Sequence, residues 1–285
     1  MKVNFFYFLI IAGLAVAGCD MVNPEEKTPL YVSVDSFSVV PTPGKDVGSL
    51  SHDIKSVLVY FNNQSVGYYN IPARIPILAD GPGQVQLVPA VSFSGLNYVR
   101  EYPYYHPDTF QIAYNPGTVV KHTGITRYRT NAMIKVEDFE NGNPFIKVNA
   151  GNSADTVLKQ EKNPAYVFEG QGAGFISLTT SHPSCEVITN QSFPIGQGNS
   201  YLEVNYKCDV PVHFGLQTTA NGTIVARYLY GVYATDTWKK VYIGLSEFTG
   251  EYKSSAYNLM IKTQLVDGKT EAQIMLDNIK IVSFP

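Results

Sequence analysis

The sequence predicts an all-β protein built from two antiparallel β-sandwiches in tandem. Aromatic and turn-forming residues are abundant, with 20 Tyr, 15 Phe, 23 Gly and 17 Pro in 285 residues, and β folds use such residues on packed sheet faces and in tight turns. Short apolar and polar alternations recur, whereas no stretch beyond the N-terminal segment keeps helical apolar spacing over three turns. A mature chain of about 260 residues is long for one sandwich, so two are expected.

Strand-like runs occur in both halves of the chain. The stretch SVLVYFNNQSVGYYNI at 56–71 predicts two strands joined by an Asn-Asn turn. Further strands are predicted at 84–91, 201–208, 212–218, 240–245, 258–266 and 279–284. The boundary is best placed between 128 and 135, which gives domains at 30–130 and 134–285.

The N-terminus has the pattern of a secretory signal. Lys2 is followed by an apolar run from Phe5 to Val16 that is too short to span a membrane. The ending Val16-Ala17-Gly18-Cys19 resembles the lipobox of bacterial lipoproteins, although an ordinary signal peptide with a chance Cys is the alternative. The resemblance implies cleavage after residue 18, a covalent lipid on Cys19, a flexible tether over 19–29, and anchoring in the cell outer membrane, facing either the periplasm or the surface.

Charge argues against nucleic acid as a partner. Removing residues 1–18 deletes one basic residue, Lys2, from 21, so 20 basic residues face 24 acidic ones and the formal net charge is −4. No basic stripe is present, and binding of phosphate backbones depends on clustered Lys and Arg.

The first half resembles an immunoglobulin-like or transthyretin-like sandwich. Its stretch NIPARIPILADGPGQVQLVPAVSFSG is similar to N-terminal modules of Bacteroidota-type surface lipoproteins. The resemblance places Pro76, Gly81 and Pro89 in turns, and Ala90 stands where such modules usually carry Gly.

The second half resembles the galactose-binding-like jelly rolls found as carbohydrate-binding modules. The resemblance rests on DFENG at 138–142, TWKKVYI at 237–243 and LDNIKI at 276–281, and it covers residues 134–285. In that family the first and last strands are neighbours and often hold a structural Ca²⁺, which nominates Glu140 and Asp277 as metal ligands. Carboxylates suit calcium, but the two acids could equally be a turn acid and a strand-end cap.

A ligand-binding face is predicted from the period-two alternation of three strands. On 201–208, 212–217 and 258–265 the apolar side chains fall on one side and the polar ones on the other. If these strands share a sheet, a polar groove suited to sugar hydroxyls is formed by Glu203, Asn205, Lys207, His213, Gln217, Lys262 and Gln264. The alternative is an ordinary solvated sheet face. An aromatic platform, which sugar sites usually add, could come from Tyr201, Tyr242 or the cluster at 102–106.

Catalysis is not expected. Adjacent acids on a strand point to opposite faces, so Glu137 and Asp138 cannot form a glycosidase pair. The five histidines show no metal-binding spacing. Cys185 and Cys208 could pair outside the cytosol or remain buried thiols, and the sequence leaves this open.

Two functions remain. The first is a membrane-anchored, non-catalytic lipoprotein that binds a glycan or similar surface ligand through its second sandwich. The second is a structural spacer or an accessory subunit of an outer-membrane protein complex. Fold alone does not choose between them.

Overall fold

A computed structural model describes residues 26–94 and 99–285. The signal peptide, the lipidation site at Cys19 and most of the tether therefore lie outside the described residues. Among the residues that are described, no helix is long and apolar enough to cross a membrane.

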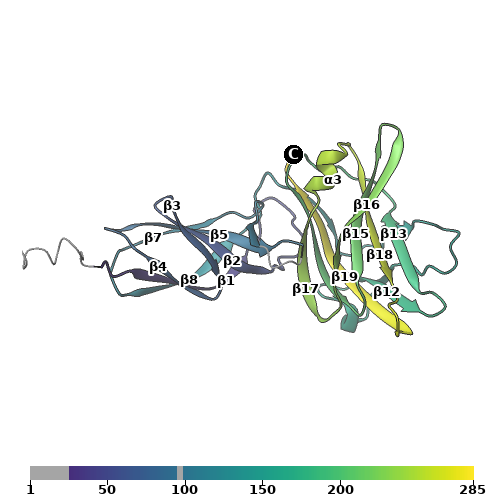
Figure 1. Ribbon diagram of the computed structural model, residues 1–285, viewed down its shortest axis with the longest axis horizontal. Helices are drawn as coiled ribbons and strands as arrows, with labels where there is room; N and C mark the ends of the chain where they lie inside the picture. The colour runs from purple at the N-terminus through teal and green to yellow at the C-terminus, as the bar shows by residue number, and fades with distance from the viewer. Residues whose placement is uncertain (1–25, 95–98) are drawn as a thin grey trace, which may run out of the picture.

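The first module contains two sheets (Figure 1). One has the order β4-β1-β8 and the other β3-β2-β5-β6, with β7 also paired to β5. The strands are β1 (Leu30–Val39), β2 (Ile54–Phe61), β3 (Gln64–Asn70), β4 (Ala73–Ile77), β5 (Gly83–Ser92), β6 (Val99–Glu101), β7 (Asp108–Ile112) and β8 (Val119–Thr126).

The second module is a jelly-roll sandwich of two sheets. A five-stranded sheet has the order β10-β13-β18-β15-β16, and a six-stranded sheet has the order β11-β12-β19-β14-β17 with β9 paired to β19. Its elements are β9 (Met133–Glu137), β10 (Phe145–Lys147), β11 (Lys159–Glu161), η1 (Pro164–Tyr166), β12 (Ala173–Thr179), β13 (Ser184–Thr189), β14 (Ser200–Cys208), β15 (Val212–Ala220), β16 (Thr223–Val232), β17 (Thr235–Gly244), α3 (Ser246–Glu251), β18 (Tyr257–Gln264) and β19 (Glu271–Ser283).

The predicted all-β class and the tandem sandwiches are confirmed, with one difference in pairing. The 56–71 stretch forms the hairpin β2–β3, and Asn62 and Asn63 both have positive φ, 48° and 64°, as a tight hairpin turn requires. Strand β1, however, pairs with β8 in parallel. The sequence alternation cannot show strand direction, because both directions put side chains on alternate faces.

Two prolines predicted to lie in turns are in strands instead. Pro76 lies in β4, an edge strand, where a missing N–H is tolerated. Pro89 lies in β5. On the edge of β5 that faces away from β2, residues 83–87 pair with β7 and residues 90–92 pair with β6, and Pro89 lies between these two stretches. Gly81 does lie between strands.

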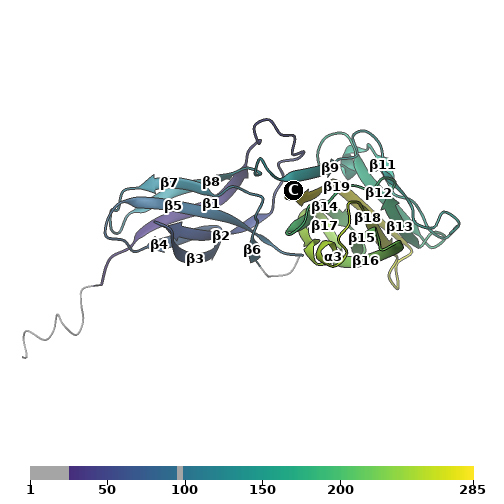
Figure 2. The same ribbon diagram turned by 90° about the horizontal axis from the view of Figure 1, so that it is seen from above.

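Each module has an apolar core, and the core of the first extends into the second. Thirty buried residues fill the interior of the second sandwich. The other cluster combines residues of the first module with Tyr201, Tyr242 and Val282 of the six-stranded sheet. The six-stranded sheet thus faces the first module, and the five-stranded sheet forms the layer farther away (Figure 2).

Candidate functional site

The outer face of the five-stranded sheet brings together four of the seven residues predicted for the groove. On β15, Phe214 and Leu216 are buried in the core, so His213 and Gln217 point to the other side. On the neighbouring strand β18, Lys262 and Gln264 face the same way, and Lys262 is the cross-strand partner of His213. The four residues thus share one face of the sheet, and their binding of a ligand stays a prediction.

A groove of about 400 Å³ lies on this face. Its walls combine the predicted polar groups with apolar and aromatic surface, so the face is hollowed rather than flat. The lining residues are Pro211, His213, Tyr228, Lys262, Thr263, Gln264 and Val266. Gln217 shares the face but does not line the groove.

Tyr228 is the aromatic residue that the sequence reasoning missed. It lies on β16, and its hydroxyl donates a hydrogen bond of 2.6 Å to Glu186 Oε1 on β13. Lys262 Nζ lies 5.8 Å from the centre of the Tyr228 ring and 3.9 Å from Glu186 Oε1. Burial and the neighbouring carboxylate raise the pKa of Tyr228 far above its usual value, so the phenol keeps its proton and remains a donor.

Sequence signals for this residue were present. The Asn221-Gly222 turn follows β15 directly, and both residues have positive φ, which is the pattern of a hairpin. Recognising it would have added β16, and Tyr228 with it, to the candidate face.

The ring of His213 lies against Gly231, its cross-strand partner on β16. A Cβ at Gly231 would stand 2.9 Å from His213 Cδ2 and 3.1 Å from Nε2. The imidazole therefore occupies space that the side chain of any other residue at 231 would fill, and it lines the groove.

The other three predicted groove residues lie elsewhere, and the single seven-residue groove is wrong. Glu203, Asn205 and Lys207 are on β14, which belongs to the six-stranded sheet. The condition that the three strands share a sheet is not met. Glu203 and Asn205 are 0% and 2% exposed because the first module covers them, and Lys207 lies farther along the strand at intermediate exposure.

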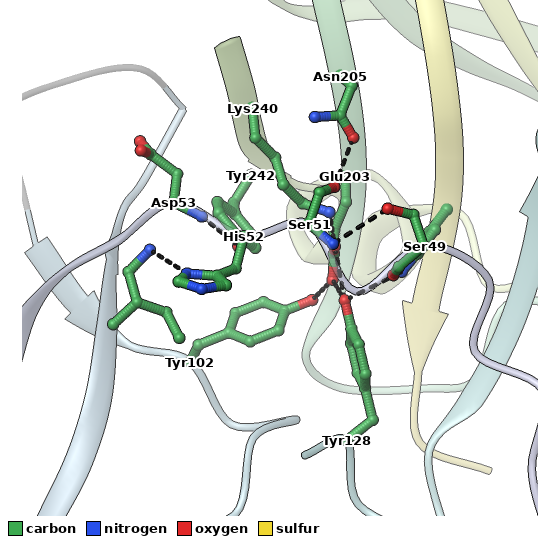
Figure 3. A network of polar contacts seen from close by, with 12 residues as sticks. Ser49, Ser51, His52, Asp53, Tyr102, Tyr128, Glu203, Asn205, Lys240 and Tyr242 are labelled. Atoms are coloured by element: carbon green, nitrogen blue, oxygen red, sulfur yellow. Dashed lines mark hydrogen bonds and ion pairs between the residues drawn. The ribbon is translucent and has the colours of Figure 1, made fainter. Parts of the chain in front are cut away.

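Glu203 is instead the centre of a buried polar network between the modules (Figure 3). Its Oε1 accepts hydrogen bonds from Tyr102 at 2.5 Å and Tyr128 at 2.9 Å, both residues of the first module. Its Oε2 lies 2.7 Å from Lys240 Nζ, a contact with the geometry of an ion pair rather than of an aligned hydrogen bond. Burial alone would raise the pKa of Glu203, but Lys240, Lys280 and the hydrogen bonds outweigh it and hold the pKa below its usual value.

Lys280 adds a second buried cation to this network. Its ammonium donates to the carbonyl oxygen of Ser49 and lies 3.4 Å from the hydroxyl of Tyr128. Burial, reinforced by Lys240, lowers the pKa of Lys280 to about 7. A buried cation of this kind needs a nearby anion, and Glu203 supplies the charge.

The segment 49–53 between β1 and β2 is fastened to the same sheet. Ser51 Oγ donates to Asn205 Oδ1 at 2.8 Å, and the backbone N–H of Asp53 donates to the hydroxyl of Tyr242 at 3.2 Å (Figure 3). Glu203 and Asn205, two of the three β14 residues that were predicted to meet a ligand, therefore contact the first module.

Glu140 and Asp277, the predicted calcium ligands, both bind the backbone of the loop 168–172. Asp277 Oδ2 accepts from the N–H groups of Phe168 and Glu169, both at 3.2 Å. Glu140 Oε1 accepts from the N–H groups of Gln171 and Gly172 at 2.7 and 3.0 Å. Burial raises the pKa of Asp277 to about 7.

This set of donors does not fit a cation site. Calcium needs six to eight oxygen ligands, whereas the oxygens of the two acids already accept five backbone N–H groups, four from the loop 168–172 and one from Asn278. Within 26–94 and 99–285, no group of three or more His, Cys, Asp or Glu is placed to hold a metal ion. Calcium binding stays a prediction that these contacts do not support, and the acids act as anchors for a loop.

Both described cysteines are free and buried. Burial raises the pKa of Cys185 to about 12 and that of Cys208 to about 11. Since the thiolate is the reactive form, burial disfavours nucleophilic reactivity at both thiols.

Comparisons with known proteins give structural neighbours only. No family model and no curated protein matches the chain. Among solved structures, a family 61 carbohydrate-binding module in complex with β-1,4-galactotriose aligns with a TM-score of 0.35 and 14% identity, covering 50% of this chain and 92% of that one. A family 30 module of a Clostridium thermocellum cellulosomal cellulase gives a TM-score of 0.38 at 13% identity, covering 50% and 94%.

A family 28 module specific for non-crystalline cellulose gives a TM-score of 0.36 at 17% identity, covering 52% of this chain and 90% of that one. The similarity concerns the sandwich of the C-terminal half. At these scores and identities it carries no argument about ligands, and the candidate site depends on its own geometry.

Proposed function

We propose that this protein is a non-catalytic lipoprotein of the cell envelope that binds a glycan through the groove on the outer face of β15, β16 and β18. The proposal includes a lipid on Cys19 and attachment to the outer membrane, both inferred from the N-terminal sequence. The observation that carries it is an aromatic ring, Tyr228, set among hydrogen-bonding side chains in a groove.

The groove offers the two kinds of contact that a sugar needs. Pyranose rings present an apolar C–H face, which packs on aromatic surface, and a rim of hydroxyl groups, which need hydrogen-bond partners. Tyr228 provides the first, and Lys262, His213 and Gln264 provide the second. The volume of about 400 Å³ lies within the range of about 300–1,000 Å³ that small-ligand sites occupy.

The groove lacks the groups for glycoside hydrolysis. That reaction uses two carboxyl groups flanking the scissile bond, one of them with a raised pKa. None of the seven lining residues is Asp or Glu. A neighbouring carboxylate, that of Glu186, is engaged by Tyr228 and Lys262. Binding without turnover is the chemistry that these residues support.

The test uses the fragment from residue 26 onward on a glycan array, followed by calorimetric titration with the glycans retained. We expect Tyr228→Ala and Lys262→Ala to weaken binding by tenfold or more, that is by about 1.4 kcal/mol or more. Tyr68→Ala is the matched control, because Tyr68 is an exposed tyrosine of the first module, 54% accessible and remote from the groove. Absence of binding by the wild-type fragment, or unchanged binding by Tyr228→Ala, would reject the proposal.

A structural spacer is the second candidate, and the buried network around Glu203 favours it. The contacts of Glu203 with Tyr102 and Tyr128 restrict the movement of one module relative to the other, which a flexible linker alone would not do. If the protein works as a rigid spacer, both modules should melt in one calorimetric transition whose enthalpy equals the van't Hoff value. Two separate transitions would remove this candidate. The glycan titration tests the first candidate independently.

A further inference from the structure

We propose that Glu186 is a positioning residue for the groove: it holds the ring of Tyr228 flat across the sheet as a stacking surface for saccharides that present an apolar C–H face. This inference depends on the proposed glycan-binding function and adds a residue to it. Glu186 itself does not line the groove, so its effect on a ligand would pass through Tyr228.

The topology shows that both side chains must be extended along the sheet. In the order β13-β18-β15-β16, two strands separate Glu186 from Tyr228. Three strand spacings amount to about 14 Å between the backbones. The hydroxyl nevertheless lies 2.6 Å from the carboxylate. Side chains standing upright from the sheet could not meet over that distance, so the phenol ring lies over the intervening strands.

Two glycines leave room for this arrangement. Gly215 is the cross-strand partner of Tyr228 beside a bulge at which Leu229 is the extra residue of β16, and a Cβ at Gly215 would stand 2.4 Å from the carbonyl oxygen of Arg227. Gly231, as described above, makes space for the His213 ring. The glycine at 215 thus lets β15 approach the backbone of β16 closely, and it adds no side chain between Tyr228 and β18.

The burial of Met260 is consistent with a tyrosine ring that lies over this part of the sheet. It is the partner of Gly215 on β18, in the same cross-strand row as Tyr228, and its neighbours in sequence, Leu259 and Ile261, fill the core. Met260 therefore belongs to the outer face, yet it is only 4% exposed. A tyrosine ring crossing the face supplies the cover that an outward methionine otherwise lacks.

Charge fixes the far end of the ring. A phenol hydrogen bond to a carboxylate is short and about twice as strong as a neutral one. Lys262 lies 3.9 Å from the same carboxylate oxygen and faces the ring, so its attraction to Glu186 keeps the carboxylate beside the phenol. A ring held before the ligand arrives costs less conformational entropy on binding than a free one.

The test compares Glu186→Ala and Tyr228→Phe, each alone and together, by titration with the glycan that the array identifies. Tyr228→Phe keeps the ring and removes only the bond, so both single variants should lose about tenfold in affinity. The double variant should lose no more than either single one, because all three break the same bond. Glu186→Gln, which keeps an acceptor oxygen, should restore part of the affinity.

A matched pair in the first module provides the control. Tyr68 donates to Glu101 at 3.1 Å on an exposed surface, and Glu101→Ala should leave the affinity unchanged. Crystal structures of ligand-free Glu186→Ala and Tyr228→Phe should show the ring displaced from the sheet. Unchanged affinity, or a ring that keeps its place in both variants, would overturn the inference.

The two proposals fail separately. If the wild-type fragment binds no glycan, the proposed function is rejected, while the ring position in the ligand-free variants still decides whether Glu186 positions Tyr228. Thermal melting of each variant identifies any loss of folding. Tyr228→Phe removes a single oxygen atom, so it is the variant whose folding should change least.

Discussion

Replacing Glu203 by Gln tests whether the junction between the modules depends on a buried charge. The carboxylate is 0% exposed and its partner Lys240 has a side chain only 2% exposed. Gln keeps the size of the side chain and an acceptor for Tyr102 or Tyr128, but it cannot neutralise a cation. Lys240 would be left buried beside Lys280, with no anion in the place that Glu203 now occupies.

The expected loss follows from the cost of an uncompensated buried charge. Removing one partner of a buried ion pair costs about 3–5 kcal/mol. The two tyrosine hydroxyls that donate to Glu203 would also lose a charged acceptor. We therefore expect Glu203→Gln to lower the free energy of unfolding by about 3–5 kcal/mol. Removing both charges, in Glu203→Gln combined with Lys240→Met, should recover much of that loss.

The assay is equilibrium unfolding of the fragment from residue 26 in urea, at pH 7 and moderate salt. Glu247→Gln is the control, because Glu247 is 79% exposed and lies 3.5 Å from Arg227. An exposed pair of this kind contributes about 0–1 kcal/mol. A loss below about 1 kcal/mol in Glu203→Gln, no larger than in the control, would refute the reasoning that the junction charge matters.

Three further predictions concern the other buried groups. Lys280 has a pKa of about 7 in the folded protein and 10.5 as its ordinary value. Between pH 7 and pH 10.5 the unfolded chain therefore binds a proton on Lys280 that the folded protein has released. The free energy of unfolding should rise from pH 7 toward pH 10 through this residue, and Lys280→Met should flatten that rise, as measured by urea unfolding across pH; an unaltered slope would contradict it. The melting temperature should be the same with calcium and with chelator, whereas a calcium-dependent rise that vanishes in Asp277→Ala would support calcium binding at this site. Thiol titration of the unreduced fragment from residue 26 should find two free cysteines after denaturation and none reactive before it, and fewer than two would indicate a disulfide.

Part of the site could be found from sequence because it depends on local rules. Alternation along a strand separates its two faces wherever the strand lies, so His213, Gln217, Lys262 and Gln264 were correctly placed on one polar face of β15 and β18. The Asn62-Asn63 turn was equally predictable, since the backbone conformation of a tight hairpin is set by the residues within it.

The sequence by itself determined strand faces, turns and the all-β class of this protein, all of which depend on neighbours a few residues apart. Only the tertiary structure decided what covers each face. Glu203 on β14 and Lys262 on β18 have the same alternating pattern, yet the first is covered by Tyr102 and Tyr128 of the first module, and the second borders an open groove. The difference arises because strand pairing and module packing join residues about 75 and 101 positions apart, and period-two alternation contains no information about such distant partners.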